Sequence, residues 1–282
     1  MKDTYESPLN SRYASDRMKY IFSPDFKFRT WRRLWIALAE SEKELGLNIT
    51  DEQIAELKAH KDDINYDVAA AREKEVRHDV MSHVYAYGVQ CPNAKPIIHL
   101  GATSCYVGDN TDVIIMREAM LLIRKELVNL LNVLAKFAVE YKDMPCLAFT
   151  HFQPAQPTTV GKRAALWLNE FLMDFQNLEF QLSQLKLLGS KGTTGTQASF
   201  MELFDNDTDK VKALDKMIAE KMGFDSCFAV SGQTYSRKLD YQMLTVLCGI
   251  AMSATKFSND IRLLQHMKEI EEPFEKHQIG SS

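Results

Sequence analysis

Hydrophobic residues recur at steps of three and four along three long stretches of the chain, a spacing that places them on one side of a helix. The stretches cover 108–145, 162–188 and 232–272, and each contains almost no internal glycine or proline. At 1.5 Å per residue, each stretch would extend roughly 40–60 Å, far beyond the average helix. The pattern therefore predicts three long helices.

Two of these stretches also carry apolar residues on more than one side. Consecutive apolar residues occur at 121–123 and at 166–168. Helices that are apolar on several sides are buried on several sides, and three of them cannot hide all that surface from one another. We therefore expect an oligomer whose subunits pool their helices. No convincing strand hairpin is visible, so we expect an all-α fold with little strand.

The first hundred residues are predicted to form shorter elements than the three long helices. Residues 1–25 are polar and irregular, and the apolar spacing over 28–45 predicts a helix that Gly46 ends. A capping box at 50–53 predicts the start of a short helix. The pattern over 66–89 again predicts helical structure.

Composition narrows the class of protein. The chain has 282 residues, of which 45% are hydrophobic, and a net charge of −4 from 34 Lys+Arg and 38 Asp+Glu. This is an ordinary soluble profile, and its near-neutral charge argues against a nucleic-acid partner. No apolar run approaches the ~20 residues of a membrane span, and the N-terminus has no signal-peptide core. Five scattered cysteines without a CxxC motif predict free thiols in a reducing compartment and no zinc site.

Candidate chemistry gathers in the loops between helices, which are rich in His, Ser, Thr, Gln and Gly. In the loop at 99–112, Thr103 and Ser104 offer hydroxyls just before a long helix. The N-terminus of that helix would attract a carboxylate or a phosphate. The alternative is structural, with one of the polar residues at 109–111 simply capping the helix.

Two further loops have the same polar character. His151, within the proline-stiffened loop at 150–163, is able to move a proton near neutral pH, although a lone histidine is more often structural. The loop at 189–200 has three glycines among threonines. The loop either binds a phosphate or carboxylate group or is simply a flexible connection. It lacks the P-loop sequence pattern.

Two shorter segments complete the set. Arg77, His78 and Asp79 are consecutive, so on a helix they would splay over roughly 200°. They form either a ligand cluster or a solvated charged patch. The chain ends in Gly280-Ser281-Ser282, which means little by itself, and no G-x-S-x-G pattern marks an acyl-transfer nucleophile.

Taken in order, these loops resemble those of the adenylosuccinate lyase family in its eukaryotic form, within the fumarase/aspartase superfamily. The resemblance runs from SRYAS near residue 11 to EEPFEKHQIGSS at the end, through RHDVM, IIHLGATSCYVGDN, THFQPAQPTTVGKR, KGTTGTQASF and GQTYSRKLD. RHDVM and KGTTGTQ favour this family over fumarases, aspartases and argininosuccinate lyases.

The resemblance implies a fumarase/aspartase-like fold. A small helical N-terminal domain would occupy 1–108 and a central long-helix domain 109–282, with four subunits pooling their central helices in one bundle. Each site would be shared between subunits. It also implies that the rest of the signature loop and the C-terminal domain lie beyond this chain. The chain departs from the family at Lys95-Pro96 and at Pro157, both beside the expected site.

The resemblance implies a C–N lyase of purine biosynthesis in the cytoplasm. Fumarate would leave by β-elimination from adenylosuccinate, giving AMP, and from the succinyl-carboxamide ribotide SAICAR, giving AICAR, with neither a metal nor an organic cofactor. His151 matches the general acid and Ser281 the general base. The residues that match substrate contacts are Arg12, Tyr13, Arg77, His78, Asp79, Thr103, Ser104 and Gln233. Three more lie in a loop of matching type: Lys191, Thr194 and Gln197.

Two alternatives belong to other classes of function. A sister lyase of the argininosuccinate type would act on a substrate without phosphate. It would not need the basic cluster formed by Arg12 with Tyr13 and by the segment 77–79. The second alternative is a non-catalytic helical scaffold. Its support is that the sequence stops inside the signature loop. The presence of both His151 and Ser281 argues against it.

Overall fold

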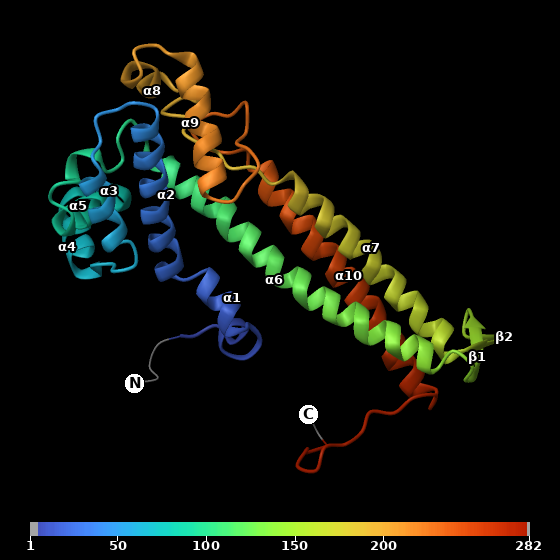
Figure 1. The fold of residues 1–282 in the computed structure, drawn as a ribbon. Coiled ribbons are helices and arrows are strands. Elements are labelled where there is room, and N and C mark those ends of the chain that lie inside the picture. The colour runs from blue at the N-terminus through green and yellow to red at the C-terminus, as the bar shows by residue number, and fades with distance from the viewer. Residues whose placement is uncertain (1–4, 281–282) are drawn as a thin grey trace. The chain divides into compact units, whose positions relative to one another are not determined.

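The computed structural model describes residues 5–280. It is mainly helical, with a single two-stranded sheet among the described residues (Figure 1). The described chain divides into two compact units. Unit 1 contains the residues up to Leu122 together with Leu182–Leu239, and unit 2 contains Ile123–Gln181 together with the residues from Asp240 onward.

Unit 1 is built from short and medium helices around the beginning of one long helix. Its elements before residue 100 are η1 (Leu9–Tyr13), α1 (Asp16–Ile21), α2 (Pro24–Glu44), α3 (Asp51–Ala59), α4 (Tyr66–Val76), α5 (Asp79–Gln90) and η2 (Lys95–Ile97). The later elements are the first part of α6 (Ser104–Glu140), α8 (Ala198–Leu203) and α9 (Thr208–Lys221).

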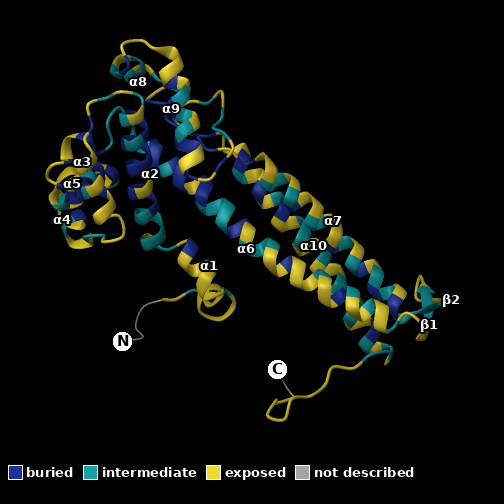
Figure 2. Ribbon diagram, in the orientation of Figure 1, coloured by how far each residue is buried: buried dark blue, intermediate teal, exposed yellow. Residues whose placement is uncertain are grey.

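Helix α2 forms the centre of unit 1. Trp31, Leu34, Trp35 and Leu38 follow helical spacing and are at most 1% exposed, and Figure 2 shows α2 largely in the colour of buried residues. Ser23 caps the helix by accepting a hydrogen bond from the Phe26 N–H. The predicted helix over 28–45 is thus confirmed, and the burial of its apolar side explains its stability.

Two local predictions in this region are also confirmed. Gly46, with φ of 103°, follows the end of α2 in the left-handed region that favours glycine. At the start of α3, the Thr50 side chain accepts from the Gln53 N–H and the Gln53 side chain accepts from the Thr50 N–H. This reciprocal pair is the predicted capping box.

Three boundaries differ from the sequence-based interpretation. The helical structure predicted over 66–89 is present but divided, because Arg77 adopts φ of 53° and separates α4 from α5. The N-terminal 25 residues are not irregular, because the Ser15 side chain accepts from the Met18 N–H and starts α1. Helix α6 begins at Ser104, so the polar residues at 109–111 lie buried inside it and do not cap it.

Unit 2 contains the rest of α6, the strands β1 (Pro145–Thr150) and β2 (Gln153–Thr159), and the helices α7 (Val160–Gln184) and α10 (Lys238–His266). The three predicted long helices are confirmed, with 37 residues in α6, 25 in α7 and 29 in α10. Of the helices within residues 5–280, none is both long and apolar enough to cross a membrane.

Polar contacts hold α7 and α10 side by side. The Trp167 indole N–H donates to Asp260 at 2.8 Å. The Ser253 hydroxyl donates to Asp174 at 2.6 Å. In these two pairs the residue number increases along α7 and decreases along α10, so the two helices run antiparallel. The apolar cluster of Ala164, Trp167 and Leu264 is buried between them.

The predicted absence of a hairpin was wrong. β1 and β2 pair antiparallel, with Thr150 opposite Gln153, and the ladder is irregular between Leu147 and Phe149. Prolines normally argue against a strand because they cannot donate to the ladder. Pro154 and Pro157 are accommodated here because β2 is an edge strand of a two-stranded sheet.

Candidate functional site

The interruption between α4 and α5 presents His78 at a helix N-terminus. Arg77 ends α4 in the left-handed region, and His78 is the N-cap of α5, where its Nδ1 accepts from the Met81 N–H at 3.3 Å. A neutral imidazole whose Nδ1 accepts carries its proton on Nε2. The His78 Nε2 atom lies 3.2 Å from the Ser104 hydroxyl, so the two groups share a hydrogen bond.

Ser104 is the first residue of α6, and the preceding loop packs closely against α8. The Ser199 hydroxyl donates to the carbonyl of Gly101 at 2.6 Å. Gly101 has φ of 65°, and a Cβ atom there would lie 2.6 Å from a methyl carbon of Leu203. The glycine therefore permits both the turn and the close approach that bring Thr103 and Ser104 to the start of the helix.

His99 joins this cluster, although no sequence pattern singled it out. The Trp35 indole N–H donates to its Nδ1 at 2.9 Å. Burial, and secondarily the charge of His78, lowers the pKa of His99 to about 4, so its ring is neutral at physiological pH. Its position two residues before Gly101 in the HLGATS loop was the available signal.

The predicted loop at 189–200 is anchored by two side chains from helices. Asp215 of α9 accepts from the backbone N–H and the hydroxyl of Ser190, both at 2.7 Å, and pairs with the Lys191 ammonium. Asn110 of α6 exchanges hydrogen bonds with the backbone of Gly189 at 3.0 and 3.1 Å. Sequence patterns missed Asp215 and assigned Asn110 only a possible capping role.

These contacts distinguish the three residues that were predicted in this loop. Lys191 is 6% exposed and its charge is neutralised by Asp215. Gln197 donates to the carbonyl of Ser190 at 2.9 Å. Thr194 is exposed, and its hydroxyl lies 3.1 Å from that of Thr196. Within this chain, Thr194 is therefore the member of the three that is most open to a ligand.

The loop that carries Gln233 lies against the loop at 189–200. A Cβ atom on Gly195 would be 2.0 Å from the carbonyl oxygen of Ser231, so the two backbones touch. Two residues beyond Gln233, the Tyr235 N–H donates to Asp109 of α6 at 2.9 Å. Gln233 itself is partly exposed. Unit 1 thus brings together the loops around His78, Ser104, Gln197 and Gln233.

Arg12 and Tyr13 lie at the end of η1 and are exposed, Tyr13 by 77%. Within residues 5–280, no hydrogen bond or ion pair joins either side chain to another predicted site residue. Ser281 lies outside the described residues. No group of three or more His, Cys, Asp or Glu side chains within the described part of the chain is arranged to hold a metal ion.

His151 belongs to unit 2, at the tip of the β1–β2 hairpin. It is exposed and borders a cavity of about 450 Å³ between the hairpin, the start of α7 and the end of α10. Lys162 and Arg163 border the same cavity. Arg163 is held by Glu269 at 2.9 Å and by the carbonyl of Leu147 at 3.0 Å. Glu269 neutralises Arg163 and Asp260 also borders the cavity, so Lys162 is the cation beside His151 that is suited to attract an anionic ligand.

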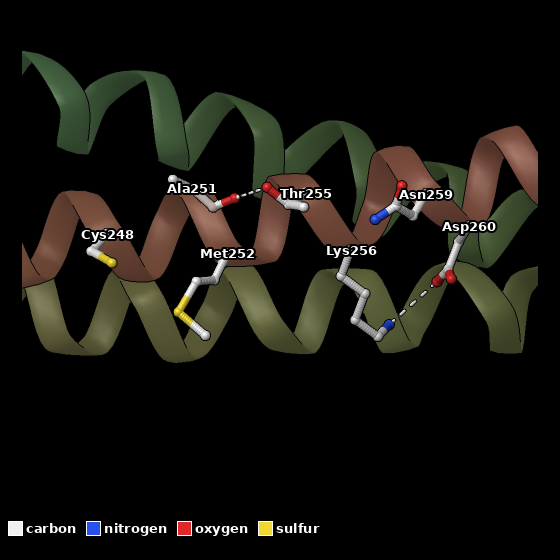
Figure 3. Close-up of a pocket in the computed structure, with 7 residues that line it drawn as sticks. All are labelled: Cys248, Ala251, Met252, Thr255, Lys256, Asn259 and Asp260. Atoms are coloured by element: carbon white, nitrogen blue, oxygen red, sulfur yellow. Dashed lines mark hydrogen bonds and ion pairs between the residues drawn. The ribbon is translucent and has the colours of Figure 1, made fainter.

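A second hollow, of about 490 Å³, lies along α10 and contains none of the predicted site residues. Figure 3 shows Cys248, Met252 and Lys256 extending from the same side of the helix. Lys256 lies 3.3 Å from Asp260, and Met252 is 69% exposed.

The family of this chain is shown by its similarity to known proteins. The model of the family described as lyase matches residues 21–282, so the chain belongs to that family. It is 54% identical to a Saccharomyces cerevisiae protein named adenylosuccinate lyase, over 99% of this chain and 59% of that protein. It is also 48% identical to the Schistosoma mansoni protein of the same name, over 99% of this chain and 58% of that protein. The resemblance inferred from the loops is confirmed.

Solved structures support the fold. The fumarate lyase from Mesorhizobium sp. BNC1 aligns with a TM-score of 0.78 at 23% identity, covering 89% of this chain and 58% of that one. At this identity the likeness shows the fold alone, and it confirms the fumarase/aspartase-like architecture. The chain spans about three-fifths of the length of the curated relatives that it matches.

Proposed function

We propose that this chain is part of an adenylosuccinate lyase. The enzyme would release fumarate by β-elimination from adenylosuccinate, giving AMP, and from SAICAR, giving AICAR. The observation that carries the proposal is the convergence in unit 1 of the loops around His78 and Ser104, the same loops that carry the resemblance. The identity of 54% to the Saccharomyces protein of that name supports the choice of substrate.

The chemistry requires a base, an acid and donors for negative charge. Ser281 would take the proton from the carbon next to a carboxylate, the C–N bond would break, and His151 would protonate the departing nitrogen. The carboxylate dianion that forms before the bond breaks needs hydrogen-bond donors close by. The Thr103 and Ser104 hydroxyls at the start of the 37-residue α6 are suited to that role.

The geometry of His78 favours hydrogen-bond donation over proton abstraction. Its Nδ1 is occupied by the Met81 N–H, which leaves the Nε2–H directed to Ser104 and its surroundings. A neutral imidazole in this state donates to an oxygen of the substrate. Arg77 and Asp79 flank it, and with Arg12 they would complete a site for a phosphate-bearing ligand.

We further propose a cytoplasmic homotetramer whose sites are shared between subunits. Unit 2 carries large apolar side chains that are more than half exposed in a single chain: Val133, Val139, Met173, Phe180, Tyr241, Leu244 and Met252. Monomeric proteins rarely leave so many apolar side chains uncovered on neighbouring helices. Figure 2 shows the exposed stretches on α6, α7 and α10, which copies of the chain would cover.

The test uses the full-length protein that contains this chain, with fumarate release as the readout. His151→Gln should lower kcat about 100-fold or more, because the departing nitrogen loses its acid. Ser281→Ala should abolish elimination while adenylosuccinate still binds. The matched control is His60→Gln, since His60 is a partly exposed histidine whose ring lies 3.5 Å from Asp63. Equal activity of the wild type and His151→Gln would refute the assigned acid.

Two further measurements test the substrate class and the assembly. Turnover of adenylosuccinate without turnover of argininosuccinate is expected, and the reverse would favour a sister lyase. Light scattering should give the mass of four chains. Mixed subunits that carry His151→Gln and His78→Gln separately should regain part of the activity, because some shared sites would then receive both intact residues.

A further inference from the structure

The tip of the β1–β2 hairpin has an unusual backbone for its sequence. Thr150 pairs with Gln153, so His151 and Phe152 alone form the connection. Their φ angles are 51° and 56°. A two-residue hairpin connection with two positive φ angles is the pattern of a type I′ turn, which is usually made by Asn-Gly or Gly-Gly. Neither position here is occupied by such a residue.

Phe152 is poorly suited to its position on conformational grounds. A side chain with a bulky Cβ substituent disfavours the left-handed region, which glycine adopts freely. The ring is 71% exposed, so it gains little burial within the chain to offset that cost. The hairpin is also short, with only two strands and two prolines in β2. Strained residues of this kind concentrate at functional sites.

The position of the ring indicates what that function is. Phe152 and His151 both line the cavity beside the start of α7, together with Lys162 (Figure 1 shows the hairpin next to α7). In the reaction proposed above, His151 protonates a nitrogen that is a substituent of the purine ring in adenylosuccinate. In SAICAR that nitrogen belongs to the carboxamide on an imidazole ring. The heteroaromatic ring must therefore lie close to His151 during the reaction.

We infer that Phe152 is a substrate-binding residue, and that its ring contacts the planar heteroaromatic ring of the substrate next to the general acid. This inference rests on the proposed function. Aromatic side chains stack on any nucleobase because every base has a π-face, so one phenylalanine serves both substrates. The turn holds Phe152 in an unfavourable left-handed conformation, and this conformation places the ring beside the imidazole of His151.

The test compares four forms of the full-length protein: wild type, Phe152→Gly, Phe152→Asn and Phe152→Tyr. Gly and Asn both accept positive φ, so these variants should keep the turn and raise Tm by about 2 °C. Both should nevertheless bind adenylosuccinate about tenfold more weakly, measured by calorimetry in a Ser281→Ala background in which elimination is abolished. Phe152→Tyr keeps the ring and should bind within about twofold of wild type.

A residue with a purely structural role would not give higher stability together with weaker binding when it is replaced. Unchanged binding by Phe152→Gly and Phe152→Asn would overturn the inference and leave the turn as a backbone feature alone. Loss of the tetramer in these variants would also overturn it, because the ring would then pack against another subunit. If His151→Gln remains fully active, the proposed function itself fails, which is a separate result from that of the Phe152 series.

Discussion

The Nε2 atom of His78 lies 3.2 Å from the hydroxyl of Ser104, while the Nδ1 atom of the same ring caps α5 through the Met81 N–H. One imidazole thus joins the start of α5 to the start of α6. Because each nitrogen has its own partner, the structural and the ligand-binding contributions of His78 are separable by substitution.

His78→Asn and His78→Ala separate the two contributions. Asn is a good N-cap and Ala is not, so only the Ala variant should lose about 1 kcal/mol of stability, seen as a lower Tm. Both variants lack the Nε2–H, so both should show KM raised about tenfold in the elimination assay, as expected for one lost hydrogen bond to a charged group. A normal KM for His78→Asn would restrict His78 to capping.

Gly101→Ala and Gly108→Ala should shift stability in opposite directions. At Gly101 a Cβ meets both a left-handed backbone and the Leu203 side chain, so we expect a loss of about 2 kcal/mol. Gly108 lies inside α6 with no atom within 4 Å of an added Cβ. Alanine there should add roughly 0.5–1 kcal/mol. Denaturant unfolding checks both, and equal effects would contradict the assigned loop conformation.

The parts of the fold that follow from local periodicity were predictable. Apolar spacing identified α2, α6, α7 and α10, and Thr50 with Gln53 identified the start of α3. Boundaries that depend on an unusual backbone were not predictable from residue type. Arginine rarely adopts positive φ, so nothing in the sequence marked Arg77 as the end of α4. Glycine is tolerated inside a helix, so Gly108 was a misleading boundary.

For the candidate site, residue types were predictable and pairings were not. His78 and Ser104 are both in polar loops, but their contact depends on where α5 and α6 begin. Asp215 sits in an ordinary amphipathic helix and has no motif around it. Its role became visible only because α9 packs where the backbone of Ser190 needs an acceptor. Buried polar groups find hydrogen-bond partners far away in the sequence, and only the fold determines which residues those partners are.

Arg32 holds together three segments of unit 1. It is 1% exposed and donates to the carbonyls of His60 and Asp63 and to the side chains of Asn65 and Gln90. Its guanidinium also lies over the Tyr87 ring, 4.3 Å from the ring centroid. These contacts account for a buried charge among the apolar residues on the buried side of α2.

Arg32→Met should lower the free energy of unfolding by about 3 kcal/mol, because buried acceptors lose their donor. The neighbouring Arg33 is exposed, so Arg33→Met is the matched control and should change stability by less than about 0.5 kcal/mol. Denaturant unfolding of the two variants measures the difference. Similar small effects at both positions would mean that the Arg32 contacts contribute little.

Glu42 is the opposite case, a buried carboxyl group without a partner. Its side chain is fully buried in α2, and neither carboxyl oxygen has a hydrogen-bond partner. Burial raises the pKa of Glu42 to about 9, far above the 4.5 of an ordinary glutamate. The folded protein therefore holds this group protonated at neutral pH, whereas the unfolded chain ionises it.

The resulting cost has a definite sign. Below pH 4.5 Glu42 is protonated in both states and costs nothing, and stability is then lost as pH rises toward about 9. Glu42→Gln does not ionise, so at pH 7 it should be more stable than wild type by on the order of 3 kcal/mol. At pH 5 the gain should fall below about 1 kcal/mol. Glu44→Gln, at an exposed position on the same helix, serves as the control and should change stability by less than about 0.5 kcal/mol. A gain that is equal at pH 5 and pH 8 would show that ionisation of Glu42 is not its source.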